Sequence, residues 1–174
     1  MGQYILKDTR HKGIGLFTET GRRKGEVLFS ENLTGLRKHT LEDINSDPAL
    51  NGDHAHYVGR GKYVIEEGLP AYMNHSCDPN CCYRKSGIGI YDVVALRDIN
   101  VGEELTHDYA ASSINQLEGL FYFEENCECG SSCCRRTIHG DFFRMPMDWQ
   151  KRFYRYLPPS IKRKYRARFK HLLR

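Results

Sequence analysis

The 174-residue sequence lacks any run of about 18 apolar residues, so no membrane-spanning helix and no membrane partner are expected. The opening residues, MGQYILKDTR, lack the apolar core of a signal peptide, and Leu6 stands where a myristoylation signal needs Ser or Thr. We therefore expect an intracellular protein whose seven cysteines are reduced. Internal repeats and low-complexity linkers are also absent, which predicts one domain with small additions.

Acidic residues are missing from the C-terminal segment 151–174. This segment carries ten of the 26 Lys and Arg residues, which leaves 16 basic and 22 acidic residues, a net charge of −6, in residues 1–150. An acidic body with a basic end is typical of a chain whose basic surface meets phosphate or another anion. Two interpretations of this end stay open. In the first, two helices pack their apolar faces on the body and keep Lys and Arg in water. In the second, the basic surface docks on nucleic acid or a nucleosome.

Short strands separated by glycine turns are the main secondary structure predicted for the body. Strands are expected at 4–9, 27–30 and 88–96, where β-branched and aromatic residues gather between turn residues. The stretch HYVGRGKYVIEEG, at 56–68, predicts a hairpin whose turn lies at 59–62. The body is therefore expected to consist mostly of short strands and loops.

Helical signals are strongest at the C-terminal end. Earlier in the chain, Thr40 is expected to cap one short helix. Near the C-terminus, one helix is expected to begin near Pro146 and to end before the two consecutive prolines at 158–159. Ser160 is then expected to cap a second helix with an apolar stripe. The segment 112–126 is compatible with a helix or with irregular structure.

Four of the seven cysteines lie in the stretch CECGSSCC, at Cys127, Cys129, Cys133 and Cys134. Thiolates are soft anionic ligands, and a structural zinc site uses four ligands in a closed tetrahedron. Adjacent cysteines rarely ligate one ion together because their side chains diverge, so one of the last two is expected to be spare. The fourth ligand must then come from elsewhere, and Cys77, in a turn that contains Pro, is the obvious donor.

Two other roles are open to the cysteines. They could be small buried residues without a ligand, which is the interpretation that a strand-like run favours for Cys81 and Cys82. Cys77 could instead form a nucleophile–base pair with His75, since residues two apart on an extended chain share a face. A nucleophile needs a free thiolate and an orienting third group, however. The neighbouring cysteine cluster competes for that thiolate, which favours zinc.

Four motifs follow one another along the chain: KGIGLF at 12–17, YMNHSCDPNC at 72–81, GEELTHDY at 102–109 and CECGSSCCRRTIHG at 127–140. In this order and spacing they resemble the SET-domain protein lysine methyltransferases with a post-SET zinc motif. The resemblance implies a mainly β fold with short helices, in which small curved sheets surround a knot-like core. It divides the chain into a SET domain at 1–111, a connector and post-SET zinc motif at 112–140, and a basic helical extension at 141–174.

The resemblance also implies S-adenosylmethionine as cofactor and a lysine side chain as methyl acceptor. The residues that it places around the cofactor are Lys12, Gly13, Ile14, Gly15, Tyr57, Tyr72, Asn74, His75 and Glu128. Glycines suit this role because they let the main chain approach a ligand closely. At position 72 the chain has Tyr where many relatives carry Arg, which is a departure from the family pattern.

Tyr109 matches the catalytic tyrosine of the family. Methyl transfer from a sulfonium to a lysine amine is an in-line displacement that needs alignment and a neutral amine. A tyrosine hydroxyl at the end of an apolar channel can orient the amine and stabilise charge near the methyl group without acting as a strong base. The post-SET spacing, Cys-x-Cys-x4-Cys, implies the zinc ligands Cys77, Cys127, Cys129 and Cys134.

His107 stands where relatives usually carry Phe or Tyr, at a position that influences how many methyl groups are added. A polar histidine can hold a water molecule, which predicts mono- or dimethylation, although its ring could also leave space for higher states. Histone tails are the expected substrates because basic peptides suit an acidic body, and another basic protein is the alternative within the class.

The expected location depends on the source. It is the nucleus or chromatin for a protein that acts in a eukaryote or a eukaryotic host, and the cytoplasm otherwise. The rival interpretation from another class is a catalytically silent, zinc-stabilised binding module whose basic tail recruits nucleic acid. Binding of S-adenosylmethionine separates the two, because a silent module need not bind it.

Overall fold

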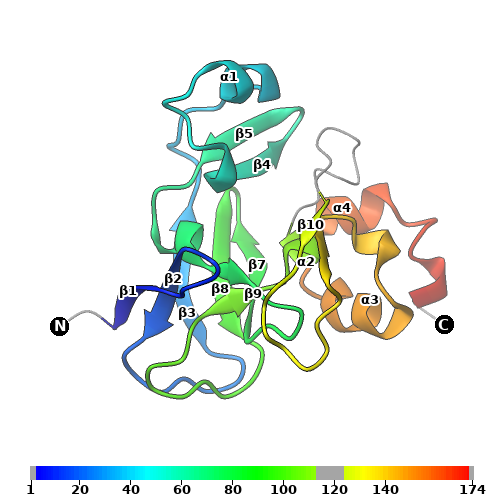
Figure 1. Ribbon diagram of the computed structural model, residues 1–174. Coiled ribbons are helices and arrows are strands. Elements are labelled where there is room, and N and C mark those ends of the chain that lie inside the picture. Colours follow the sequence, from blue (N-terminus) through cyan, green and yellow to red (C-terminus); the bar gives the residue numbers. More distant parts are fainter. Residues whose placement is uncertain (1–2, 113–123, 173–174) are drawn as a thin grey trace.

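The computed structural model describes residues 3–112 and 124–172 (Figure 1), and no helix among them is long and apolar enough to cross a membrane. Most of the segment 112–126 therefore lies outside the described residues. The strands are β1 (Tyr4–Asp8), β2 (Ile14–Thr18), β3 (Val27–Asn32), β4 (Ala55–Gly59), β5 (Lys62–Ile65), β6 (Asn74–His75), β7 (Cys81–Gly87), β8 (Ile90–Ala95), β9 (Thr106–His107), β10 (Glu124–Asn126) and β11 (Thr137–His139). The α-helices are α1 (Leu41–Ser46), α2 (Tyr109–Ser112), α3 (Met147–Tyr154) and α4 (Pro159–Lys164), and the short 3-10 turns are Gly52–His54, Leu69–Tyr72, Phe142–Arg144 and Lys170–Leu172.

The strands form several small sheets rather than one large one. In the described residues these are a three-stranded sheet, β3-β8-β7, and the pairs β1-β2, β4-β5, β6-β9 and β10-β11. The predicted mainly β fold with short helices is therefore confirmed.

The middle strand of the three-stranded sheet is buried on both faces. Alternate residues of a strand point to opposite faces. Val93 and Ala95 pack with Leu16 and Leu105 in one hydrophobic core, while Val94 packs with aromatic residues of the C-terminal extension in a second core. This double burial explains why β8 ends in the continuous apolar run VVA instead of alternating with polar residues.

Two very short strands bring distant motifs together. β6 and β9 pair in parallel, with His75 opposite His107. The side chain of Asn80 fixes this junction: its NH2 group donates to the Glu104 carbonyl at 2.7 Å, and its carbonyl accepts from the Thr106 N–H at 2.9 Å. The motifs YMNHSCDPNC and GEELTHDY therefore lie side by side inside the molecule.

The predicted hairpin is present as β4 and β5, directly below α1 in the upper part of Figure 1. Its turn contains Arg60 (φ 55°) and Gly61 (φ 69°). Two successive residues with positive φ give a turn whose twist matches that of paired strands. The predicted cap of α1 is also confirmed, since the Thr40 hydroxyl accepts from the Asp43 N–H and the Asp43 carboxylate accepts from the Thr40 N–H.

The C-terminal extension packs on the central sheet through large apolar side chains. Phe142, Phe153 and Phe169 are almost completely buried and share a core with Cys82 and Val94 of the sheet. Burying a side chain of this size stabilises a fold by about 1.5–3 kcal/mol. Of the two interpretations of this end, the one in which its apolar faces pack on the body agrees with this core.

The helices of the extension differ in detail from those that the sequence predicts. α3 begins directly after Pro146, as expected. α4 begins at Pro159, with Pro158 as its N-cap, so the prediction that Ser160 caps this helix is wrong. Proline is accepted at the first helical position because its missing N–H has no partner there in any helix. Phe169 reaches the core from the turns that follow α4.

Candidate active site and metal centre

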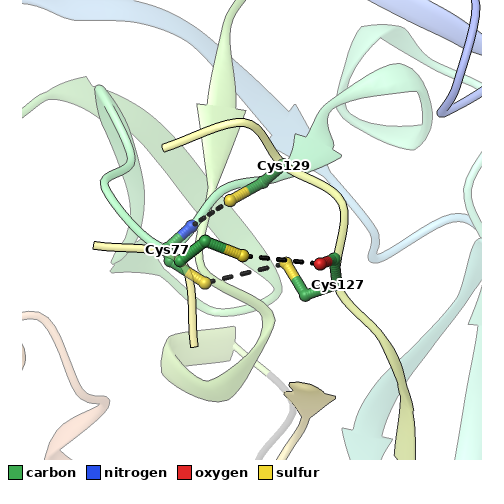
Figure 2. Close-up of side chains that lie close together, drawn as sticks. Cys77, Cys127 and Cys129 are labelled. Atoms are coloured by element: carbon green, nitrogen blue, oxygen red, sulfur yellow. Dashed lines mark hydrogen bonds between the residues drawn. The ribbon is translucent and has the colours of Figure 1, made fainter. Parts of the chain in front are cut away.

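Four cysteine sulfurs converge between the turn after β6 and the loop between β10 and β11. The sulfurs of Cys77, Cys127, Cys129 and Cys134 all lie within 4.8 Å of one another, and the first two are 3.7 Å apart. Figure 2 shows three of these side chains pointing toward one another. A zinc ion bound about 2.3 Å from each of four sulfurs holds them about 3.8 Å apart, so the described geometry fits a closed tetrahedral site.

Backbone donors surround the sulfur cluster. The N–H groups of Arg135 and Arg136 donate to the sulfurs of Cys77 and Cys134 at 3.4 Å, and the Cys77 N–H donates to Cys129 Sγ at 3.5 Å. Such donors stabilise negative sulfur. Burial raises the pKa of the Cys77 thiol, so a thiolate at that position is favoured by a bound cation. The donor set therefore suits Zn²⁺.

The remaining three cysteines lie outside this cluster. Cys133 is exposed, and its sulfur contacts the Ser131 hydroxyl at 3.2 Å. Cys81 and Cys82 are buried on strand β7, on opposite faces of the central sheet. Their interpretation as strand residues is confirmed.

A cavity of about 1030 Å³ opens beside the paired strands β6 and β9. Among its lining residues are seven that the sequence analysis places at the site: Lys12, Ile14, Tyr57, Tyr72, Asn74, His107 and Tyr109. They come from seven different elements or loops, so only the fold brings them together. The volume is ample for a ligand of nucleoside size, and the lining mixes aromatic rings with a few polar groups, as in other ligand sites.

A polar network borders the cavity, whose lining includes Lys12, Ile14 and Asn74. Lys12 Nζ forms an ion pair with Glu104 Oε2 at 2.5 Å, and the Asn74 side-chain NH2 donates to Glu104 Oε1 at 2.9 Å and to the Ile14 carbonyl at 3.3 Å. A Cβ on Gly15 would lie 2.8 Å from Glu104 Oε1, so a larger residue would collide with this network. Gly15 is therefore required by close side-chain packing, whereas Gly13 adopts a positive φ of 70°.

His75 connects the sulfur cluster to Tyr109. Its Nδ1 accepts from the Tyr109 N–H at 3.3 Å, so the proton of the neutral ring sits on Nε2, which lies 3.4 Å from Cys77 Sγ. Burial lowers the pKa of His75 to about 3, with help from Arg135 and Lys12 nearby. The ring is thus neutral and committed to protein partners, and His75 is not among the residues that line the cavity.

Tyr109 lies at the first position of α2, in contact with two histidine rings. The ring centroids of His75 and His107 are 5.2 Å and 4.9 Å from that of Tyr109. Burial, followed by the charges of Glu125 and Asp53, raises the pKa of Tyr109 to about 12. The hydroxyl therefore stays protonated near neutral pH, the form that can donate a hydrogen bond.

His107 is buried between two tyrosines. Its ring lies 4.9 Å from the rings of Tyr83 and Tyr109, measured between centroids. Burial lowers the pKa of His107 to about 3, and the neighbouring His75 and His56 act in the same direction. The imidazole is therefore neutral at physiological pH.

Several residues of the site have no signal in the sequence reasoning. The cavity is also lined by Glu66, Tyr83 and Glu125, which no motif indicates. Glu104, whose carboxylate accepts a hydrogen bond from Asn74, lies in the motif GEELTHDY but is not among the predicted site residues. In contrast, Glu128, which the resemblance places at the cofactor, is exposed in the loop of the sulfur cluster. The one sequence signal for Glu104 is that it is the second of two consecutive carboxylates in the motif GEELTHDY.

Comparison with known protein families matches the SET domain over residues 13–110. The chain therefore belongs to the SET-domain family. Among curated proteins it is 40% identical over 140 residues to the histone-lysine N-methyltransferase ash1 of Drosophila melanogaster, and 32% identical over 139 residues to the histone-lysine N-methyltransferase ASHH2 of Arabidopsis thaliana. These alignments cover 76% and 75% of this chain but 6% and 8% of the two relatives.

A shorter relative gives a similar picture. The probable histone-lysine N-methyltransferase set-23 of Caenorhabditis briggsae is 39% identical over 127 residues, which is 67% of this chain and 44% of the relative. The chain thus spans less than half the length of these curated relatives.

Proposed function

We propose that this chain is a protein-lysine N-methyltransferase that transfers a methyl group from S-adenosylmethionine to a lysine side-chain amine, with histones as its substrates. Membership of the SET-domain family and the names of the relatives support this proposal. The observation that carries it is the joint lining of one cavity by Asn74 and Tyr109, from two motifs that the parallel pair β6-β9 brings together. Histone substrates imply a nuclear or chromatin location.

The chemistry of the cavity suits this reaction. S-adenosylmethionine, when bound, supplies a methyl group on a positively charged sulfonium. The polar network of Lys12, Glu104 and Asn74 offers hydrogen-bonding groups for the cofactor beside the cavity. Tyr109 and His107, which also line the cavity, present aromatic rings and neutral polar groups.

The accepting lysine must reach the methyl group as a neutral amine. Moving an ammonium group from water to an aromatic, water-poor wall lowers its pKa. The rings of Tyr83, His107 and Tyr109 are in contact and form such a wall. The protonated Tyr109 hydroxyl then orients the amine through a hydrogen bond, which contributes alignment, not proton removal.

We assign a structural zinc ion to the sulfurs of Cys77, Cys127, Cys129 and Cys134. A four-sulfur site leaves no open position for substrate, so its role is to tie the post-SET loop to the turn after β6. We also propose that His107 sets the degree of methylation. Its neutral, polar ring favours mono- or dimethylation, and mass spectrometry that shows efficient trimethylation would contradict this.

The test of the activity uses labelled S-adenosylmethionine, mixed histones and the zinc-loaded protein. The wild-type chain should label histones, and Tyr109→Phe should lower the rate on the order of a hundredfold. The matched control is Tyr4→Phe, because the Tyr4 hydroxyl donates to the Leu28 carbonyl and is not part of the cavity lining. A well-folded, zinc-loaded chain that binds no S-adenosylmethionine in calorimetry would support a silent binding module instead.

A second function, docking on nucleic acid, is favoured by the surface of the C-terminal extension. Phe153, Leu157, Ile161 and Phe169 face the core. The exposed basic residues on the same segment are Lys151, Arg152, Arg155, Arg163, Lys164, Arg166, Arg168 and Lys170. A cationic surface of this kind contacts phosphates and so makes binding salt-dependent. We propose that it docks the enzyme on nucleosomal DNA.

Deleting the extension would remove buried core residues, so the test must change charges instead. The triple variant Arg163→Glu, Arg166→Glu and Lys170→Glu should weaken binding to duplex DNA and flatten the slope of log K against log salt, by about 0.9 for each phosphate that the variant no longer neutralises. The double variant Arg37→Glu and Lys38→Glu changes exposed residues elsewhere and should bind as the wild type does. Equal binding by the triple variant would contradict docking.

A further inference from the structure

One buried carboxylate, that of Asp108, lies directly before Tyr109 in the chain. The residue is 1% exposed. Its Oδ1 accepts from the Ala110 N–H at 3.1 Å, as the side chain of an N-cap residue does, at the start of α2. Because Tyr109 is the first residue of α2, the orientation of this carboxylate sets where the helix begins and how the tyrosine backbone is held.

Two segments from outside the SET match converge on the same carboxylate. The guanidinium of Arg135, in the loop of the sulfur cluster, donates to both oxygens of Asp108 at 2.8 Å and 2.9 Å. The indole N–H of Trp149, on α3, donates to Oδ2 at 3.0 Å. Four hydrogen bonds thus meet two oxygens, and a paired two-point contact with Arg fixes the plane of the carboxylate.

Arg135 and a further residue, His75, link this arrangement to the sulfur cluster. The Arg135 N–H donates to Cys77 Sγ, and His75 spans Cys77 and the Tyr109 N–H. The position of Tyr109 is therefore determined from both sides by groups that depend on the post-SET loop.

We propose that Asp108 is a positioning residue for Tyr109, and that Arg135 and Trp149 hold the Asp108 carboxylate in place. The post-SET loop and the C-terminal extension are then both part of the catalytic framework. The inference rests on the proposed methyltransferase function. It gives the extension a role in catalysis besides packing and docking, because α3 supplies one of the four hydrogen bonds. A misplacement of about 1 Å can lower a rate on the order of a hundredfold.

The main test compares Asp108→Asn with a matched control, Asp92→Asn. An amide in place of the Asp108 carboxylate keeps one acceptor oxygen and sets an NH2 group against two donors. Asp92 is also a buried carboxylate paired with an arginine, since it accepts from Arg84, Ser30 and Ser86, but it lies in the central sheet. Both variants should lower the melting temperature, which serves as the measure of a purely structural effect.

The two variants should differ in catalysis. We expect Asp108→Asn to lower kcat by about tenfold to a hundredfold, while its KM for S-adenosylmethionine stays within about twofold of the wild-type value. Asp92→Asn should keep the wild-type kcat at temperatures below its melting temperature. Trp149→Phe keeps an aromatic ring against Phe142 and removes one donor only, so it should lower kcat severalfold while folding normally. This variant preserves the test if Asp108→Asn fails to fold.

A second readout needs no activity. Trp149 is the only tryptophan in the chain, so intrinsic fluorescence reports directly on its contact with Asp108. Asp108→Asn should shift the emission maximum, and Asp92→Asn should not. If the wild-type chain transfers no methyl group at all, the proposed function fails. If the wild type is active and both Asp108→Asn and Trp149→Phe keep its kcat, the positioning role alone is overturned.

Discussion

The buried ring of His107 should make the protein sensitive to mild acid. Burial, with His75 and His56 nearby, lowers the pKa of this imidazole to about 3, whereas in the unfolded chain it has the ordinary value of about 6.5. Below pH 6.5 the unfolded state therefore binds a proton that the folded state does not. The contribution of the neutral His107 ring to the free energy of unfolding is therefore fully present above pH 6.5 and is lost as the pH falls from 6.5 toward 3.

The magnitude follows from the two pKa values. Each pH unit within this window costs about 1.4 kcal/mol, so the free energy of unfolding should fall by about 2 kcal/mol between pH 7 and pH 5 because of His107 alone. His107→Phe removes the titration and keeps an aromatic ring at the site. Any change in packing that the substitution causes is the same at both pH values, so it does not enter the comparison.

Urea unfolding followed by circular dichroism at pH 7 and pH 5 measures this effect. The loss of stability between the two pH values should be about 2 kcal/mol smaller in His107→Phe than in the wild type. Both proteins share the same cysteine cluster, so effects of acid on zinc cancel in the comparison. The exposed Ile88, changed to Ala, is the control and should keep the wild-type pH dependence. An identical pH dependence in His107→Phe would refute the reasoning.

Three further predictions concern the metal, the core and the cofactor. Cys77→Ser should lose the zinc ion and lower the melting temperature, whereas Cys133→Ser should retain one zinc per chain. A colorimetric zinc assay and thermal denaturation measure the two effects, and equal zinc contents in the two variants would contradict the ligand assignment. Phe153→Ala should lower the free energy of unfolding by about 3–5 kcal/mol, while Ile88→Ala, at a side chain 89% exposed, should change it by less than about 0.5 kcal/mol in urea titrations. Glu104→Gln should raise the Kd of S-adenosylmethionine about fivefold in calorimetry, because it removes the charge that pairs with Lys12 in the cavity lining.

Most of the functional predictions depend on the spacing of motifs along the chain. The order of NHSC, GEELTHDY and the post-SET cysteines was sufficient to predict the family, and the adjacent Cys133 and Cys134 were sufficient to predict that one of them is spare. The structure brings together the four cysteines that this reasoning selected. Local signals also predicted the hairpin at β4 and β5 and the cap at Thr40, because turns and caps depend on neighbouring residues.

The sequence was less informative where side chains from distant segments meet. The resemblance indicates that His75 contacts the cofactor, but its ring is held between Cys77 and the backbone of Tyr109. The start of α4 also differs from the expectation, because the helix begins at Pro159 with Pro158 as its N-cap and not at a Ser160 cap. Glu128 has the right motif position, yet the described loop leaves it exposed.

By itself, the sequence determined the family, the cysteine ligand set that we propose and the identity of Tyr109 as the candidate catalytic residue, because these are encoded in residue type and spacing along the chain. Only the tertiary structure decided that Lys12 pairs with Glu104, and that Arg135 and Trp149 meet at Asp108. The physical reason is that a hydrogen bond requires its two groups within about 3 Å. Whether residues far apart in sequence come that close depends on how sheets and loops pack, which spacing along the chain does not encode.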